Sequence, residues 1–231
     1  MLRKRFERLN ALAKINAAGK YLEIGVHSGN TFHQVHVSRR VAVDPKFRFN
    51  TRDYVDEKTN FYEITSDEFF SKFAPDHGEF DLIYLDGLHT FEQTFRDFCA
   101  SLRYSHSRTI WLIDDTHPCG WFASHPDFTF VRASRKVLRI RDKRWMGDVY
   151  KVIFAIHDFF PQLSYATFPD HGQTAVWLET RSNFTPTWNS LKKISNLGYG
   201  DFQKFKDSHL RILDYPEILD SIGQKFAHAP T

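Results

Sequence analysis

The sequence predicts an α/β protein in which a mainly parallel sheet carries helices on both faces. Three observations indicate this architecture. Short apolar runs alternate with segments that carry helix-start residues through most of the chain. A loop with two glycines follows the first run, and acids follow the fourth and fifth. Two further runs near the end predict a hairpin, which gives a seven-stranded sheet with one antiparallel member.

The composition limits the classes of protein that fit this sequence. A chain of 231 residues with 42% hydrophobic residues suits one domain with additions. The net charge of +3 does not indicate a nucleic-acid partner. No apolar run reaches the ~18 residues of a membrane span, and the basic N-terminus lacks the apolar segment of a signal peptide. The two cysteines have no metal spacing, and we expect Cys99 in the core of a cytoplasmic protein.

The first half of the chain contains the parallel strands and their helices. An amphipathic helix is expected over residues 2–18, with Gly19 ending it. The runs expected to form strands are Tyr21–Ile24, Val41–Val43, Phe61–Ile64, Leu82–Leu85 and Ile110–Ile113. Ser66 is suited to cap a helix over 67–73, and Thr90 forms a capping-box pair with Gln93 before another helix.

The second half of the chain departs from the strand–helix alternation. Asp148 is suited to cap a helix that Pro161 closes. Strands are then expected at Leu163–Phe168 and Thr174–Leu178, joined by the turn-rich residues 169–173. These two strands complete the predicted sheet as its terminal hairpin.

The chain is expected to divide into a main domain and an extension. The domain spans residues 1–182 and includes a long, basic, loop-like insertion at 115–147, a candidate lid. Residues 183–231 carry weak helical patterning around 188–194 and 201–212. This aromatic-rich extension is expected to pack on the same domain or on a partner subunit, so a homodimer is one arrangement it would allow.

The first glycine loop and the next strand predict a nucleotide-like pocket. Gly25 and Gly29 let the backbone approach a ligand that a Cβ atom would push away. Asp44 ends the second strand, where a carboxylate can hold both hydroxyls of a ribose. A strand-to-helix turn with no ligand is the alternative for this loop, and a polar helix start is expected after it.

Acids end two neighbouring strands at the same edge of the predicted sheet. Asp86 follows the fourth strand, and Asp114 and Asp115 follow the fifth. Crowded carboxylates repel one another, and a divalent cation relieves that repulsion. Oxygen ligands favour Mg²⁺, Ca²⁺ or Mn²⁺ over zinc. Helix capping and loop hydrogen bonding are the structural alternative for these acids.

His89 is expected near these acids, and its ordinary pKa of about 6.5 suits a general base near neutral pH. Such a base would remove the proton of a hydroxyl held by the metal. Stabilisation of its own loop is the alternative for His89. His117, in the sequence Asp-Asp-Thr-His-Pro, ranks below His89 as the base.

In their order along the chain, these motifs resemble those of class I S-adenosylmethionine-dependent methyltransferases. Within that family, the small bacterial sugar and macrolide O-methyltransferases are the most similar group. The resemblance rests on Leu22–Thr31, on Val43-Asp44-Pro45, on Phe80–Phe91 with its Asp-Gly-x-His turn, and on Ile113–Thr116. It covers residues 20–180 and implies a Rossmann-like fold.

The resemblance also implies roles for individual residues. It implies cofactor binding by Glu23, Gly25, Gly29, Asp44, Ser66, Asp67 and Asp86. It implies divalent-metal ligation, with Mg²⁺ as the expected ion, by Asp86, Asp114 and Asp115. Asp86 and His89 would be catalytic, and the segment Trp145–Lys151 would line the acceptor pocket. Leu88 stands where some of these enzymes have an acid proposed as the base, so that role passes to His89 or is absent.

Three functions are therefore compared. The first is metal-assisted methyl transfer from S-adenosylmethionine to a hydroxyl of a small-molecule acceptor, a sugar or glycosylated metabolite. The second is a nicotinamide-dependent oxidoreductase, although His27 and Asn30 interrupt the Gly-x-Gly-x-x-Gly spacing. The third is a non-catalytic module that binds the cofactor but has lost the reaction, which the substitution at Leu88 keeps open.

Overall fold

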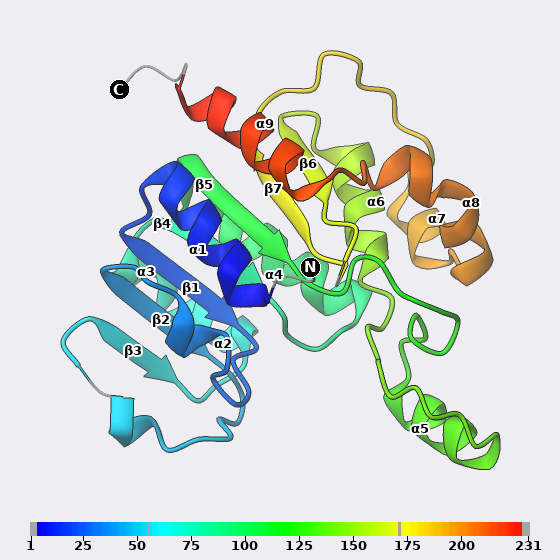
Figure 1. Cartoon of the computed structure of the whole chain (residues 1–231), viewed down its shortest axis with the longest axis horizontal. Helices are drawn as coiled ribbons and strands as arrows, with labels where there is room; N and C mark the ends of the chain where they lie inside the picture. Colours follow the sequence, from blue (N-terminus) through cyan, green and yellow to red (C-terminus); the bar gives the residue numbers. More distant parts are fainter. Residues whose placement is uncertain (1–3, 55, 171, 228–231) are drawn as a thin grey trace.

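The computed structural model describes residues 4–54, 56–170 and 172–227, and it contains the predicted seven-stranded sheet (Figure 1). The strands are β1 Lys20–Ile24, β2 Arg39–Val43, β3 Thr59–Tyr62, β4 Phe80–Leu85, β5 Ser105–Ile113, β6 Leu163–Thr167 and β7 Thr174–Leu178. Their order in the sheet is β3-β2-β1-β4-β5-β7-β6. β7 runs antiparallel to both β5 and β6, and the other neighbours pair in parallel. The predicted fold class is confirmed.

Alternation along the central strands produces two cores, one on each face of the sheet. In β5, Trp111 and Ile113 enter one core, whereas Ile110 and Leu112 enter the other. All four side chains are fully buried. Burial on both faces explains why these strands are continuous apolar runs rather than alternating ones.

Helices cover both faces of the sheet (Figure 1). They are α1 Arg5–Asn16, α2 Ser66–Lys72, α3 Ala74–His77, α4 Phe91–Ser101, α5 Phe128–Val137, α6 Tyr150–Phe159, α7 Leu191–Ser195, α8 Tyr199–His209 and α9 Tyr215–Ala227. α1 and α9 contribute to one core, and α2, α4, α6 and α8 contribute to the other. Short 3₁₀ helices occupy Phe32–Gln34, Thr51–Tyr54 and Leu102–Tyr104.

Several local predictions in the first half of the chain differ from the structure. The glycine loop leads into a single 3₁₀ turn at Phe32–Gln34 instead of an α-helix. The cap of α2 is Thr65, whose hydroxyl accepts the Glu68 amide, and Ser66 is already helical. α1 ends at Asn16, before the predicted end at Gly19, and its C-cap is Ala17 in a left-handed conformation. Residues 2 and 3 of the predicted helix lie outside the described residues.

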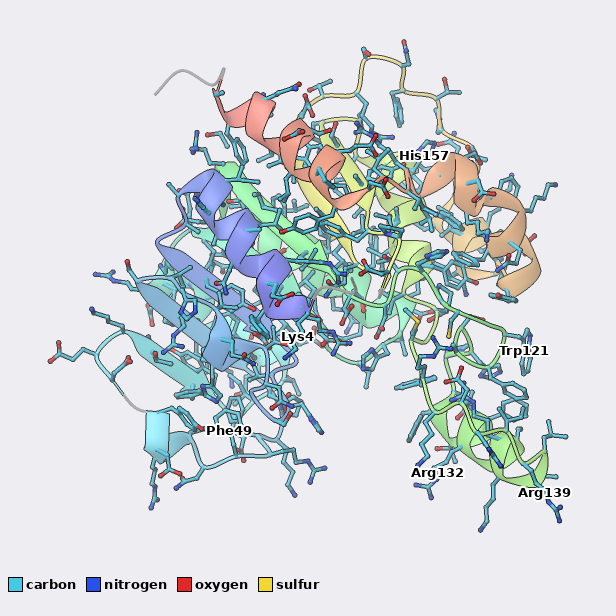
Figure 2. All side chains as sticks on the ribbon, viewed as in Figure 1. Lys4, Phe49, Trp121, Arg132, Arg139 and His157 are labelled. Carbon is cyan, nitrogen blue, oxygen red and sulfur yellow. The ribbon has the colours of Figure 1, made fainter. Side chains whose placement is uncertain are left out.

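The second half of the chain also differs from prediction in places. The predicted loop-like insertion contains α5, which extends away from the body with Arg132 on it and Arg139 just past its end (Figure 2). Asp148 does not cap α6, because its side chain accepts the Phe91 amide and pairs with Lys151. Its role is to connect the start of α4 to the start of α6.

The extension contains more helix than its sequence pattern indicates. α9 was not predicted, yet Ile218 and Ile222 on it are fully buried in the core that α1 shares. Cys99 is exposed rather than in the core. Within the predicted hairpin loop, His171 lies outside the described residues.

Arg8, a buried arginine on α1, pairs with residues at the β6–β7 turn of the sheet. Arg8 is completely buried, and its guanidinium donates to Gln173 and pairs with Asp170, both contacts at 2.5 Å. The guanidinium also lies 5.1 Å from the centre of the Phe168 ring. A buried charge is tolerated only when it is paired, so the position of α1 depends on the β6–β7 turn.

We expect Arg8→Ala to destabilise the protein by about 3 kcal/mol, because it breaks a buried ion pair and leaves a cavity. Urea denaturation followed by circular dichroism measures this change. Lys14→Ala, on the exposed side of the same helix, is the matched control and should change the stability by less than about 0.5 kcal/mol. Equal effects of both substitutions would show that the pair does not hold α1.

Candidate active site

A pocket of about 700 Å³ lies at the carboxyl ends of the central strands, where β1 and β4 are neighbours. At this point the chain order of the strands reverses, which is where open α/β sheets bind ligands. The pocket brings together the predicted cofactor-binding, metal-binding and catalytic residues except Gly29 and Asp114. Of the segment Trp145–Lys151, which was predicted to line the acceptor pocket, only Trp145 is among the lining residues. Residues predicted from separate motifs therefore share one cavity.

The two glycines of the first loop are required by contacts within the protein. Gly25 has a φ of +91°, and a Cβ atom there would lie 1.9 Å from the backbone oxygen of Asp86. Gly29 has a φ of +73°, and a Cβ atom there would meet the His33 ring. Gly25 lines the pocket, so its lack of a side chain keeps the β1 and β4 loops close together beside the cavity.

Asp44 is held rigidly at the wall of the pocket. One carboxylate oxygen accepts the His27 amide at 2.8 Å, and the other accepts the Lys46 amide at 2.7 Å. Each oxygen keeps a second lone pair for another donor. The backbone thus fixes the direction of a carboxylate that can still accept two hydroxyl hydrogen bonds.

Glu23 is an almost fully buried acid beside the first loop. Its side chain is 2% exposed and accepts a hydrogen bond from the Tyr21 hydroxyl at 2.6 Å. Burial raises the pKa of Glu23 to about 8, although Tyr21 and Arg5 oppose the shift. The carboxyl group therefore carries a proton at neutral pH in this structure.

The wall that follows β3 contains two residues that sequence analysis did not assign to the site. Ser66 and Asp67 line the pocket, and Gln93 and Asp97 line it with them. The Gln93 amide donates to all three of the others. Its predicted capping-box position placed Gln93 at the start of α4, but only the fold shows that this start faces α2.

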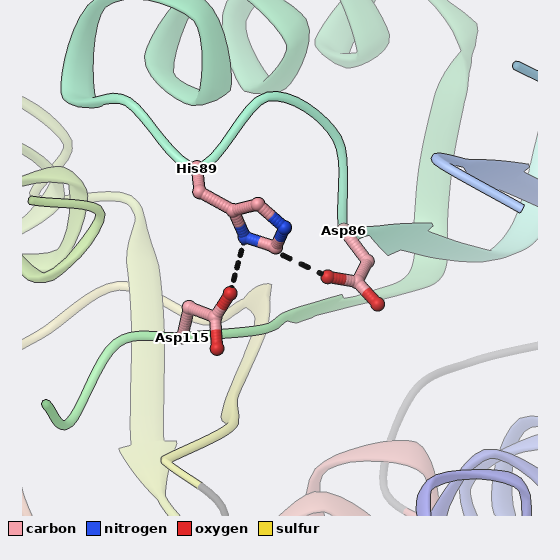
Figure 3. Close-up of side chains that lie close together, drawn as sticks. All are labelled: Asp86, His89 and Asp115. Atoms are coloured by element: carbon pink, nitrogen blue, oxygen red, sulfur yellow. Dashed lines mark ion pairs between the residues drawn. The ribbon is translucent and has the colours of Figure 1, made fainter. Parts of the chain in front are cut away.

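His89 and Asp115 form the closest pair at the other end of the pocket (Figure 3). His89 Nδ1 forms an ion pair with Asp115 Oδ2, and Asp86 Oδ1 lies 4.0 Å from the same nitrogen. Burial lowers the pKa of His89, but Asp115 outweighs this effect and the net pKa is raised. The Trp145 ring packs edge-on against the imidazole at 5.1 Å.

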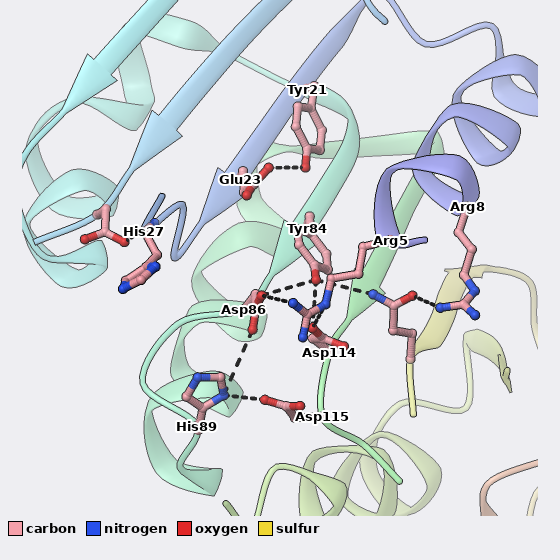
Figure 4. A network of polar contacts seen from close by, with 12 residues as sticks. Arg5, Arg8, Tyr21, Glu23, His27, Tyr84, Asp86, His89, Asp114 and Asp115 are labelled. Carbon is pink, nitrogen blue, oxygen red and sulfur yellow. Dashed lines mark hydrogen bonds and ion pairs between the residues drawn. The ribbon is translucent and has the colours of Figure 1, made fainter. Parts of the chain in front are cut away.

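Asp114 lies in a buried network that Asp86 connects to His89 (Figure 4). Its Oδ2 atom accepts the Tyr84 hydroxyl at 2.8 Å and pairs with Arg5 Nε at 2.6 Å. Arg5 also lies 4.0 Å from Asp86, and Gln173 donates to the Tyr84 hydroxyl. Burial raises the pKa of both Asp86 and Asp114, and repulsion from Asp114 adds to the shift of Asp86, as repulsion from Asp115 does for Asp114. Arg5, which no motif indicated, supplies the compensating positive charge.

Three side chains could hold a metal ion. Asp86, His89 and Asp115 each offer a ligand atom, and these atoms all lie within 4.8 Å of one another. This set shares two residues with the predicted one and has His89 in place of Asp114. Two carboxylates and an imidazole suit Mn²⁺ or a similar transition metal better than an all-oxygen set would.

Unusual backbone conformations are concentrated at this pocket. His27, His89 and Asp115 all line it with positive φ values of 48°, 53° and 62°. Non-glycine residues rarely adopt such values, and they occur more often at functional sites. Gly147 packs so closely on His89 that a Cβ atom would lie 1.6 Å from its carbonyl oxygen. The base of the insertion thereby fixes the His89 loop.

Comparison with known proteins assigns the domain. Residues 22–116 match a family described as a methyltransferase domain, and they contain both pocket ends described above. The match covers less than half of the chain, and it supports the class I S-adenosylmethionine-dependent methyltransferase domain predicted from the sequence. The family resemblance and the enzyme class predicted from the sequence are confirmed. Of the three functions compared, the methyltransferase is the one that this match supports.

Solved structures share the fold of this chain at low sequence identity. An O-methyltransferase from Bacillus cereus, solved in complex with SAH, is 16% identical and has a TM-score of 0.54; the match covers 77% of this chain and 82% of that one. The SAH-bound methyltransferase PaMTH1 from Podospora anserina is 14% identical, with a TM-score of 0.52, over 77% and 80% of the two chains. Among curated proteins, none matches this sequence. Within the described residues, no helix is long and apolar enough to span a membrane.

The raised pKa of Glu23 gives a prediction about stability. Between the ordinary value of 4.5 and about 8, the folded protein binds this proton more tightly than the unfolded chain. This group therefore makes the folded state less stable as the pH rises through that window. Glu23→Gln removes the effect, so its Tm relative to wild type should rise from pH 5 to pH 8.5. We expect a change on the order of 3 °C or more.

Differential scanning calorimetry at both pH values measures this change. Glu79→Gln, at an exposed position, is the control and should show the same difference from wild type at each pH. A Tm difference for Glu23→Gln that did not depend on pH would contradict the buried, protonated state of Glu23.

Proposed function

We propose that this protein transfers a methyl group from S-adenosylmethionine to a hydroxyl oxygen of a small molecule. The sequence resemblance suggests a sugar or glycosylated metabolite as the acceptor. One observation carries the proposal: a single pocket connects a nucleoside-type end at Asp44 and Ser66 to a proton-accepting pair, His89 and Asp115. Transfer to a hydroxyl needs both ends within one enclosure.

The first end suits the cofactor. Asp44 would accept the two ribose hydroxyls, and Ser66 and Asp67 would contact the adenine. Glu23 would face the ammonium group of the methionine part and exchange its proton for that cation. Several acids around the cavity also favour the positive sulfonium over a neutral ligand.

The second end suits removal of a hydroxyl proton. In the transfer, the oxygen–methyl bond forms while the sulfur–methyl bond breaks, and neutral S-adenosylhomocysteine leaves. His89 would take the hydroxyl proton, and Asp115 would orient the imidazole and stabilise its protonated form. Leu88 is 61% exposed and lines the pocket with Trp145. These apolar surfaces suit a carbon ring beside the reacting hydroxyl.

A second arrangement uses the same end of the pocket to bind a divalent cation. Asp86, His89 and Asp115 would be its ligands, and their shared ligand distances favour it. A cation bound there would lower the pKa of an acceptor hydroxyl. His89 cannot then be the base as well, so the two arrangements predict different responses to chelation.

We expect full-length protein to bind S-adenosylhomocysteine with micromolar affinity and Asp44→Ala to weaken that binding at least about tenfold. The reason is the loss of two hydrogen bonds to a charged acceptor. Isothermal titration calorimetry measures the affinity, with NAD as the competing ligand. Glu57→Ala, at an exposed position, is the control. Tight binding of NAD with none of S-adenosylhomocysteine would contradict the proposed cofactor.

We expect His89→Gln and Asp115→Asn each to lower kcat by about 10²-fold or more, with little change in cofactor affinity, because both remove a positioned proton acceptor. Methyl transfer from labelled S-adenosylmethionine to a panel of glycosides and catechols provides the assay. The control is His106→Gln. His106 also pairs with an aspartate, Asp81, at 2.8 Å, but it lies outside the pocket at the start of β5.

Adding a metal chelator distinguishes His89 as the base from His89 as a ligand of a divalent cation. Activity that survives EDTA and is lost in His89→Gln supports the base. Activity that EDTA abolishes and Mn²⁺ restores supports the cation instead. Unchanged kcat in His89→Gln would exclude both roles for this residue.

A further inference from the structure

The insertion between β5 and α6 forms an arm that the proposed function does not use. We define the basic arm as residues 121–145, which include α5. The arm extends away from the sheet, with Trp121, Arg132 and Arg139 along it (Figure 2). Only its base touches the pocket, through Trp145, which packs on both His89 and Phe128.

Exposed apolar side chains are concentrated on the basic arm. Among the described residues, nine large hydrophobic side chains are exposed, and five of them lie here. These five are Trp121, Phe128, Phe130, Val137 and Leu138. Val137 and Leu138 are 80% and 61% exposed. A grouped apolar surface of this kind marks an interaction site more often than scattered exposed residues do.

Positive charge is concentrated on the same arm. Its basic residues are Arg132, Arg135, Lys136, Arg139, Arg141, Lys143 and Arg144, and its acids are Asp127 and Asp142. The whole chain has a net charge of only +3, so the rest of the protein is net acidic. A partner with a negative surface would therefore meet the arm first.

On α5, the helical spacing places the exposed apolar side chains and the basic side chains on different faces. Phe130, Ala133 and Val137 follow one another at three and four residues and form one stripe. Arg132 and Lys136 form a second stripe, whereas Val131 and Arg135 are buried. The helix thus presents an apolar face and a basic face to its surroundings.

We propose that the basic arm docks on an anionic lipid surface, with Val137, Leu138 and Phe130 entering the interface and the arginines contacting the headgroups. An amphipathic helix with basic residues and exposed aromatic and aliphatic side chains has the composition of an interfacial helix. Such helices lie in the plane of the surface and span nothing. The proposal does not depend on methyl transfer.

Lipid explains the aliphatic side chains better than the other anionic partners do. Nucleic acid would use the arginines and the aromatic rings, but it offers little apolar surface to Val137 and Leu138. A second copy of this chain would bury the apolar stripe, yet its basic arm would have to meet another basic arm in a symmetric contact. An anionic bilayer complements both faces of α5 at once.

Co-sedimentation of the full-length protein with lipid vesicles tests the proposal. We expect binding to vesicles of phosphatidylcholine with 30% phosphatidylglycerol, and none to phosphatidylcholine alone. Val137→Ser combined with Leu138→Ser, and separately Arg139→Glu combined with Lys143→Glu, should each weaken binding about tenfold or more. Leu191→Ser and Lys204→Glu, exposed outside the arm, are the matched controls and should bind like wild type. Circular dichroism checks that each variant is folded.

The position of Trp121 provides a second measurement. Its fluorescence, taken as the difference between wild type and Trp121→Phe, should shift to the blue on binding. Equal binding to both kinds of vesicle, or no binding, would overturn the proposal. It would also be overturned if light scattering showed a dimer that Val137→Ser with Leu138→Ser dissociates, or if the arm bound single-stranded RNA and not vesicles.

Discussion

The pairing of Arg5 with buried acids is the interaction on which the rest of this structure depends. Parallel strands bring Asp86 and Asp114 to the same edge of the sheet, where Asp114 is buried and Asp86 lines the pocket. Without a nearby cation, their repulsion would oppose the fold that assembles the pocket. Although burial opposes its charge, these carboxylates raise the pKa of Arg5, which remains protonated. The positive charge that compensates these two carboxylates therefore comes from Arg5 on the first helix.

This compensation makes α1 part of the site. The helix is fastened twice, by Arg8 through Gln173 and by Arg5 through Asp114, and Tyr84 joins the two contacts by hydrogen bonds (Figure 4). Movement of α1 would expose two buried charges together. α9 packs on the same helix, so the extension at the end of the chain also supports the pocket. Stability and site geometry are therefore coupled through one buried polar network.

The sequence predicted what depends on local pattern and missed what depends on distant contacts. Apolar runs gave all seven strands, since burial on both faces leaves a continuous signal in β1 and β5. Asp44 and Asp86 were found because they end such strands. Arg5 gave no signal, because nothing in a basic amphipathic helix indicates that one arginine turns toward acids far along the chain. α5 was missed for another reason: its many basic residues and its place in a long insertion indicated a loop, although its apolar side chains recur at helical spacing.

Asp114 and Asp115 show why adjacency in sequence does not give a shared role. Successive side chains at a strand end point to opposite sides. Asp114 still follows the strand direction and faces Tyr84, whereas the positive φ of Asp115 turns its carboxylate toward His89. Ligation of one ion by both remains a prediction. The geometry favours a division in which Asp114 is neutralised by Arg5 in the interior and Asp115 acts with His89 at the pocket. On that division, replacing Asp114 would reduce stability first, and replacing Asp115 would reduce turnover first.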